Sequence, residues 1–278
     1  MSSSVLEKII RIVNYIAITL LALIFMFPLY WMVVTAFKEM HEVVSMPPVF
    51  FPANPSFSSF RRVIGEFGFM RSFYVSAVVS LTVTVFSVFN AALAGFAFAK
   101  YEFKGQRILF ILVLATMMIP FQVIMIPLYV MIVNLNWHDS FAGLIVPSLI
   151  SGFGIFLMRQ FMDSLPGDLF DAGRIDGCSG FRLFWQIALP NVKPALSALC
   201  IFQFMFQWNS FFWPFLIINE TRMRPVSLAL ALYQNQFTGP QYNLVMAANL
   251  IVIAPTLILF LCLQRNFVQG IALTGMKA

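Results

Sequence analysis

The sequence is poor in charge. Of its 278 residues, 10% are Asp, Glu, Lys or Arg, whereas soluble domains carry roughly 25%. Sixty per cent of the residues are hydrophobic, a balance that argues against a soluble domain and predicts a polytopic membrane protein. No basic stripe with interleaved aromatic residues occurs, so the net charge of +6 does not indicate nucleic-acid binding.

Cysteine and histidine are also scarce. The three cysteines, Cys178, Cys200 and Cys262, are far apart and form no Cys-x-x-Cys pair, which argues against a disulfide framework or a zinc site. The two histidines, His41 and His138, have no cluster of potential ligands beside them. We therefore expect no metal and no other cofactor in this chain.

The motifs of catalysis are missing. No Gly-x-x-x-x-Gly-Lys-Ser/Thr segment occurs, so the chain is not expected to hydrolyse ATP itself. A membrane enzyme would need clustered nucleophiles, acids or metal ligands, and the adjacent pair His138 and Asp139 is weak support for one. We expect a chain without a catalytic site.

The sequence has long apolar runs instead. A helix needs about 20 mostly apolar residues to cross a bilayer, because lipid offers no hydrogen-bond partners to exposed backbone groups. We predict an all-α membrane protein, with residues 1–278 as one domain that contains six transmembrane helices. The predicted spans are 12–34, 72–98, 108–133, 140–157, 196–218 and 244–263.

The predicted spans contain no Asp, Glu, Lys, Arg or His. Ion-coupled carriers usually place such groups at the midplane, so their absence argues against this class. Backbone carbonyls at broken helices can also hold sodium, however, and an ion-coupled secondary transporter of a small polar solute stays as the alternative. Prolines fall in or near the spans at positions 28, 120, 127, 147, 214 and 255, where each tends to kink a helix.

The distribution of positive charge predicts the orientation. If the N-terminus is cytoplasmic, eleven of the 17 lysines and arginines lie on the inner side and six on the outer side. Cytoplasmic loops carry the excess of these residues, so both termini are expected inside. The segment 159–195, between the fourth and fifth spans, then faces the cytoplasm.

The fifth span carries Gln203, Gln207 and Ser210 on one face. Amides are costly against lipid, so this face is expected to turn inward. Amides beside aromatic rings suit sugars, whose hydroxyls need hydrogen-bond partners and whose C–H faces stack on rings. Hydrogen bonds between helices are the other reading, which we favour slightly over a translocation path.

The cytoplasmic segment "SLPGDLFDAGRIDGCSGFRLFWQIALPNVKP" reads as two short helices joined by a turn. Ser164 is expected to cap the first helix and Gly177 to end it, and Ser179 to cap the second. The second helix has a broad apolar face, which comprises Phe181, Phe184, Trp185 and Ala188. The first helix is small-sided and polar, so it suits either a groove on another protein or a connector on the membrane surface.

This segment resembles the cytoplasmic "EAA" loop of binding-protein-dependent ABC importers, which reads Glu-Ala-Ala, Asp-Gly-Ala and Ile-x-Leu-Pro at fixed spacing. Here the corresponding residues are 171–173 (Asp-Ala-Gly), 176–178 (Asp-Gly-Cys) and 187–190 (Ile-Ala-Leu-Pro). The segments "FPLYWMVVTAFK" and "RNFVQGIALTGMKA" are similar to the carbohydrate-importer permeases, in particular to the shorter permease of the maltose and glycerol-phosphate type.

The resemblance implies a permease that imports a carbohydrate in the bacterial cytoplasmic membrane. Its partners would be a second permease, two ATPase subunits that bind ATP and Mg, and an extracytoplasmic solute-binding protein. The helix that docks on the ATPase would comprise Asp171, Ala172, Gly173, Arg174, Asp176 and Gly177. The loop that contacts the binding protein would include Gln234, Asn235, Gln236, Gly239 and Tyr242. In the maltose-type system the sugar site lies mainly in the other permease.

Overall fold

The computed structural model describes residues 3–65, 68–234 and 241–275, with side chains for residues 7–65, 68–232 and 241–264. The described part of the chain is helical or irregular and has no strand, as the all-α prediction requires. Four of its helices are long and apolar enough to cross a membrane, and the number rises to six if each of two bent pairs counts as one span.

The chain divides into two compact units, which are described one at a time. The prediction of a single membrane domain over 1–278 stays a prediction. Unit 1 holds residues 1–69 and 232–253. It contains α1 (Ser3–Ala36), α2 (Met40–Val43), α3 (Ser58–Gly65) and the first part of α15 (Tyr242–Gly275). Unit 2 holds residues 70–231 and 254–278.

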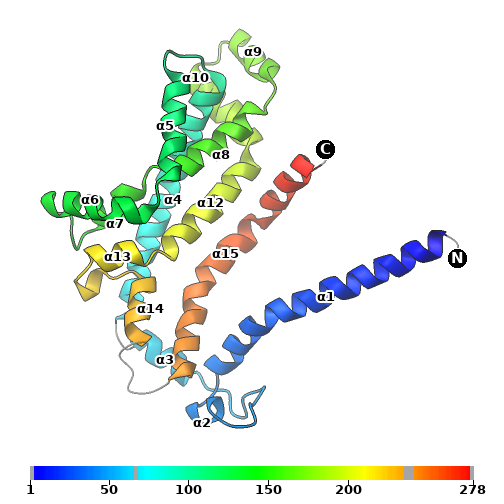
Figure 1. Cartoon of the computed structure of the whole chain (residues 1–278), viewed down its shortest axis with the longest axis vertical. Coiled ribbons are helices and arrows are strands. Elements are labelled where there is room, and N and C mark those ends of the chain that lie inside the picture. Colours follow the sequence, from blue (N-terminus) through cyan, green and yellow to red (C-terminus); the bar gives the residue numbers. More distant parts are fainter. Residues whose placement is uncertain (1–2, 66–67, 235–240, 276–278) are drawn as a thin grey trace. The chain divides into compact units, whose positions relative to one another are not determined.

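Unit 2 contains most of the helices (Figure 1). Its longer helices are α4 (Phe69–Lys100), α5 (Gln106–Met118), α6 (Phe121–Asn134), α8 (Gly152–Asp163) and α12 (Lys193–Trp208). Its shorter elements are α7 (Phe141–Ile145), η1 (Val146–Ser148), α9 (Gly167–Ile175), α10 (Gly180–Arg182), the π-helix η2 (Leu183–Ala188), α11 (Leu189–Asn191), α13 (Phe212–Ile217), η3 (Thr221–Met223) and α14 (Val226–Gln234).

Helices α5 and α12 both pack on α8. Within unit 2, α9 and α10 lie at one end of these helices, whereas α6, α7 and α13 lie at the other (Figure 1). The sequence of α4 allows close packing, because a Cβ on Gly95 would lie 2.8 Å from the backbone nitrogen of Arg159 in α8. Ser76 of α4 is buried and accepts a hydrogen bond of 2.7 Å from the backbone nitrogen of Val226, which fixes the start of α14.

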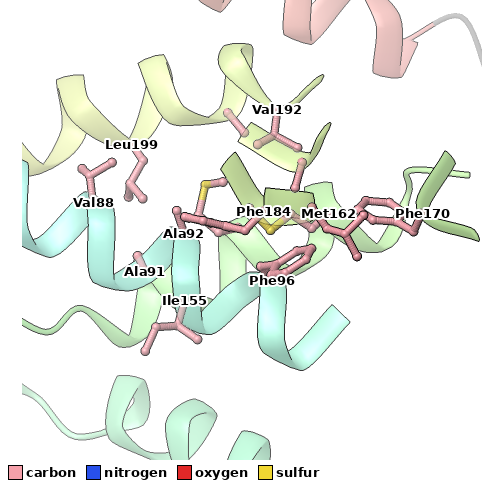
Figure 2. Close-up of a cluster of buried hydrophobic side chains, with 14 residues drawn as sticks. Val88, Ala91, Ala92, Phe96, Ile155, Met162, Phe170, Phe184, Val192 and Leu199 are labelled. Atoms are coloured by element: carbon pink, nitrogen blue, oxygen red, sulfur yellow. The ribbon is translucent and has the colours of Figure 1, made fainter. Parts of the chain in front are cut away.

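The core of unit 2 is an apolar cluster between α4, α8, α9, η2 and α12 (Figure 2). Phe184 is fully buried at its centre, with its ring centroid 5.4 Å from that of Phe96. Phe170 is 2% exposed, and its ring lies 6.0 Å from Phe96. The segment 164–194, which contains α9 and η2, therefore shares one core with the apolar helices rather than lying apart from them.

The third predicted span, 108–133, is not one continuous helix. It is divided into α5 and α6, whose axes differ by 99° across a break at Ile119 and Pro120. Pro120 has no backbone N–H, and it pushes the preceding residue out of the helical region, so that Ile119 is extended with φ −86° and ψ 115°. By contrast, Pro28, Pro127 and Pro255 lie inside continuous helices.

The fourth and fifth spans are also interrupted. The candidate span 141–163 includes α7, η1 and α8, with Pro147 in the 3₁₀ turn between the helices. The fifth predicted span, 196–218, is divided at residues 209–211 into α12 and α13, and an 82° bend separates α12 from the helices before it. The first, second and sixth predicted spans lie within α1, α4 and α15.

Candidate functional site

The first candidate site is the polar surface of α9. One side of this helix is anchored, because Phe170 and Gly173 are buried. A Cβ on Gly173 would lie 2.7 Å from Leu183 Cδ2 and 2.7 Å from Ile187 Cδ1, so only glycine lets α9 approach η2 this closely. Lys100 Nζ lies 4.8 Å from the centroid of the Phe170 ring, and this cation–π contact adds a second attachment to α4.

The opposite side of α9 is open to solvent. Five of the six predicted docking residues are exposed, and Gly173 is the exception; the exposed ones are Asp171, Ala172, Arg174, Asp176 and Gly177. Arg174 Nη1 donates a hydrogen bond of 2.8 Å to Asp171 Oδ1. More than half of the Asp171 side chain is exposed, so this ion pair contributes about 0.2–1 kcal/mol and places charge on the surface rather than holding the fold.

The ends of these helices follow the predicted pattern at two of three positions. Gly177 follows the C-cap residue of α9, Asp176, and has φ +75°, a conformation that glycine adopts without strain. Ser179 accepts a hydrogen bond from the backbone nitrogen of Arg182 and so caps α10. The prediction for Ser164 was wrong: its hydroxyl donates to the carbonyl oxygen of Phe161 at the end of α8, and Pro166 precedes α9.

The predicted apolar face of the second helix is only half buried. Phe184 and Ala188 lie in the core, whereas Phe181 and Trp185 are exposed and stack with their centroids 6.2 Å apart. The helix is π-helical from Leu183 to Ala188, and its wider turn changes which side chains share a face. The two exposed rings form a small apolar patch on α10 and η2.

The second candidate site lies at the other end of unit 2, where two cavities adjoin. One has a volume of about 400 Å³ and the other about 580 Å³. Both fall within the range of small-molecule sites, which is roughly 300–1,000 Å³. They share four lining residues, which are Phe121, Pro147, Ser148 and Phe206.

The predicted face of the fifth span points into these cavities. Gln207 and Ser210 line the smaller cavity, and Gln203 lines the larger one, so the structure brings all three residues to the same region. Gln207 is 6% exposed. Within the described residues, neither glutamine side chain makes a hydrogen bond to another part of the chain. Among the described residues of this chain, no hydrogen bond between helices involves the side chains of Gln203 and Gln207. Both interpretations of this polar face stay predictions.

Several residues of this region were not predicted from the sequence. Phe121 and Gln122 come from the start of α6, and Asn209 and Trp213 come from the end of α12 and from α13. Trp213 is buried, and its ring centroid lies 6.1 Å from that of Phe121 in a perpendicular arrangement. The signal that marks Phe121 is the interruption of a predicted span, since this residue directly follows Pro120.

Comparison with known proteins identifies the family. The model of the binding-protein-dependent transport system inner membrane component matches residues 91–273. The permease protein AraQ of the arabinooligosaccharides transport system from Bacillus subtilis is 32% identical over 274 residues, which cover 97% of each chain. The permease protein UgpE of the sn-glycerol-3-phosphate transport system from Yersinia enterocolitica is 32% identical over 258 residues, which cover 90% of this chain and 91% of UgpE.

The chain belongs to the binding-protein-dependent transport system inner membrane component family. It is thus a multi-pass membrane component of an importer, and no observation supports the ion-coupled alternative. A more distant relative is the lactose transport system permease protein LacG of Rhizobium radiobacter, which is 26% identical over 270 residues and 97% of this chain.

A solved structure has the same fold as this inner membrane component. It is the crystal structure of a bacterial ABC transporter involved in the import of the acidic polysaccharide alginate. The TM-score is 0.82, and the match covers 96% of this chain and 99% of the other at 22% identity. The TM-score establishes a common fold, and an identity of 22% says nothing about the substrate.

The third predicted site of this inner membrane component is the loop before α15. Asn235, Gln236 and Gly239 lie outside the described residues, and Gln234 closes α14 with a side chain that is not described. Tyr242 begins α15 and is 51% exposed. The contact of this loop with a solute-binding protein stays a prediction.

Proposed function

We propose that this chain is the permease subunit of an ATP-binding-cassette importer that carries a carbohydrate or a sugar derivative across a bacterial cytoplasmic membrane. The observation that carries the coupling part of this proposal is the two-sided character of α9, which is buried through Phe170 and Gly173 and exposed through its charged residues. The transport systems to which AraQ, UgpE and LacG belong support a saccharide or a sugar-like polyol phosphate as the substrate.

The polar surface of α9 is proposed to dock on an ATPase subunit. Asp171, Arg174 and Asp176 would supply charged contacts, while Ala172 and Gly177 would allow close approach. A push on this surface would pass into the apolar helices, because Phe170 and Phe184 share a core with Phe96 of α4. Packed interiors transmit such displacements with little compression.

The remaining parts of the assembly follow from this role. We propose a heterodimer with a second permease, two ATPase subunits that bind ATP and Mg, and a solute-binding protein on the outer side. Both termini and α9 would face the cytoplasm, which agrees with the excess of lysine and arginine on that side. The loop that contains Gln234 and Tyr242 would then face the binding protein.

The docking role is tested by reversing two charges, Asp171→Lys together with Asp176→Lys. Both side chains are exposed, so the fold should be retained, whereas an electrostatically complementary ATPase surface should now repel α9. Association of the ATPase should weaken by about tenfold or more, which corresponds to roughly 1.4 kcal/mol. Co-purification of the ATPase and ATP-dependent sugar uptake in proteoliposomes measure the two effects.

The matched control reverses two exposed glutamates outside α9, Glu7→Lys with Glu102→Lys. It changes the net charge by the same amount and should leave ATPase association intact. If the α9 variant binds the ATPase and takes up sugar as the wild type does, the docking role is wrong.

A further inference from the structure

Three interruptions of helical backbone meet at the two adjoining cavities. Phe121 follows the break at Ile119 and Pro120, Pro147 and Ser148 belong to the turn between α7 and α8, and the third break is residues 209–211. In a bilayer, irregular backbone is tolerated where it is buried in protein or lines a water-filled cavity. In secondary transporters, substrate sites are typically formed by such discontinuous helices. The convergence of three breaks therefore marks this region as a place where a polar solute can be held.

Two unpaired amides face this region. Gln207 is 94% buried, since 6% of its surface is exposed, and its side chain has no hydrogen-bond partner among the described residues. Gln203 precedes it by one helical turn, is half-buried and likewise lacks a partner in the described part of the chain. Both residues line the cavities, so a ligand that offers hydroxyl groups there would give these amides the hydrogen-bond partners that the described part of the chain does not supply. Both amides can donate and accept hydrogen bonds, as can a sugar hydroxyl.

Aromatic rings complete the lining. Phe121 and Phe206 contribute to both cavities, and Phe206 is 69% exposed, so much of its surface is free to meet a ligand. Phe153 and Phe202 meet at 6.3 Å in a perpendicular arrangement beside the larger cavity. Flat apolar surfaces next to amides match the two kinds of surface of a sugar ring, which has C–H faces and a rim of hydroxyls.

The lining carries no charge. The described residues that line the two cavities include no Asp, Glu, Lys, Arg or His. A phosphate or carboxylate placed there would be desolvated without a cationic partner, which is strongly unfavourable. We infer that the adjoining cavities form a subsite of this chain for a neutral saccharide of more than one sugar residue, with Gln203 and Gln207 as the specificity-determining groups.

This inference rests on the proposed function and goes beyond it in two respects. It selects neutral saccharides, whereas the named relatives include permeases for neutral sugars and for sn-glycerol 3-phosphate. It also assigns substrate contact to this subunit, rather than to the partner permease alone. Two cavities that share four lining residues provide room for consecutive sugar rings.

The test uses proteoliposomes that contain the complete importer and its binding protein. The variants are Gln203→Met, Gln207→Met and their combination, because methionine keeps the length of glutamine and removes its hydrogen bonds. The neutral probes are lactose and arabinotriose, and the anionic probe is sn-glycerol 3-phosphate. The double variant should lower the maximal uptake of the neutral probe that the wild type carries by about tenfold, as expected for two lost hydrogen bonds.

One further readout and one control variant separate this effect from a general loss of structure. ATP hydrolysis stimulated by the loaded binding protein should stay near the wild-type rate in both single variants and in the double variant. Gln160→Met is the matched control, because Gln160 is exposed on α8 and lines neither cavity. Its uptake should equal that of the wild type.

The outcomes distinguish this inference from the function on which it rests. If the wild type takes up sn-glycerol 3-phosphate and neither neutral probe, or if the double variant takes up its neutral probe at the wild-type rate, the inferred subsite is wrong and ATP-driven import stands. If wild-type uptake does not require ATP, the proposed function fails and the inference fails with it.

Discussion

Trp213 and Gly143 are joined by a buried hydrogen bond, in which the indole Nε1 donates to the carbonyl oxygen at 2.9 Å. The bond links α13 to α7 across 70 residues of sequence. Gly143 is required at this position, because a Cβ there would collide with the carbonyl oxygen of Trp137. Trp213 lines the smaller cavity. The position of this wall thus depends on a contact with a separate helix, α7.

Replacement of Trp213 by phenylalanine should destabilise this end of unit 2. The Gly143 carbonyl would stay buried without its partner, at a cost of about 1–3 kcal/mol. The midpoint of thermal unfolding of the purified permease complex should fall. Trp185→Phe is the control, because Trp185 is 55% exposed and belongs to η2 rather than to α7 or α13. Equal midpoints for the two variants would show that the bond does not stabilise the protein.

A larger side chain at Gly173 should separate α9 from η2. Leucine is a better helix former than glycine, so Gly173→Leu does not weaken α9 itself, but its side chain would overlap Leu183 and Ile187. Overpacking of this kind costs about 1–3 kcal/mol. We expect the ATPase to dissociate at least several-fold more readily, which co-purification measures. Gly167→Leu in the same helix is the control, because a Cβ at this position would meet no atom within 4 Å, and the variant should behave as the wild type. A loss of ATPase binding in both variants would contradict the packing argument.

The apolar runs were sufficient to predict the spans within helices α1, α4 and α15, because the hydropathy of a window of about 20 residues depends on its composition alone. The breaks within the other spans depend on single residues. Pro120 was recognised as a possible kink, yet Pro127, seven residues later, leaves α6 continuous. A proline therefore indicates where a helix can break, and the surrounding packing determines whether it does.

The two candidate sites also differ in how far the sequence predicted them. The exposed residues of α9 were predicted from a local motif, and Gly177 and Ser179 have the roles that their chemistry favours. Of the residues that line the cavities, the sequence singled out only Gln203, Gln207 and Ser210, and it singled them out as an inward-facing polar face. Their other walls come from α6, η1 and α13, which meet because of bends that no local pattern specifies.

Lys38 provides a test of electrostatics in unit 1. It is 2% exposed, its Nζ lies 4.3 Å from the centroid of the Trp31 ring, and it donates a hydrogen bond to the carbonyl oxygen of Val49. Burial lowers the pKa of Lys38 below its ordinary value of 10.5, and the negative charge of Glu42 offsets part of this effect. The lysine lies just after α1 and so couples the end of that helix to the loop that follows it.

The pH dependence follows from the direction of this shift. Between the lowered pKa and 10.5 the unfolded chain binds more protons than the folded one, so the contribution of Lys38 to stability rises with pH across this window. Lys38→Met removes that contribution. The unfolding free energy of the wild type minus that of the variant should therefore increase as the pH is raised from neutral towards 10.5. Denaturation of the purified complex at several pH values measures this quantity. A difference for Lys38→Met that stays constant or shrinks across the window would mean that burial does not penalise the charged form of this lysine.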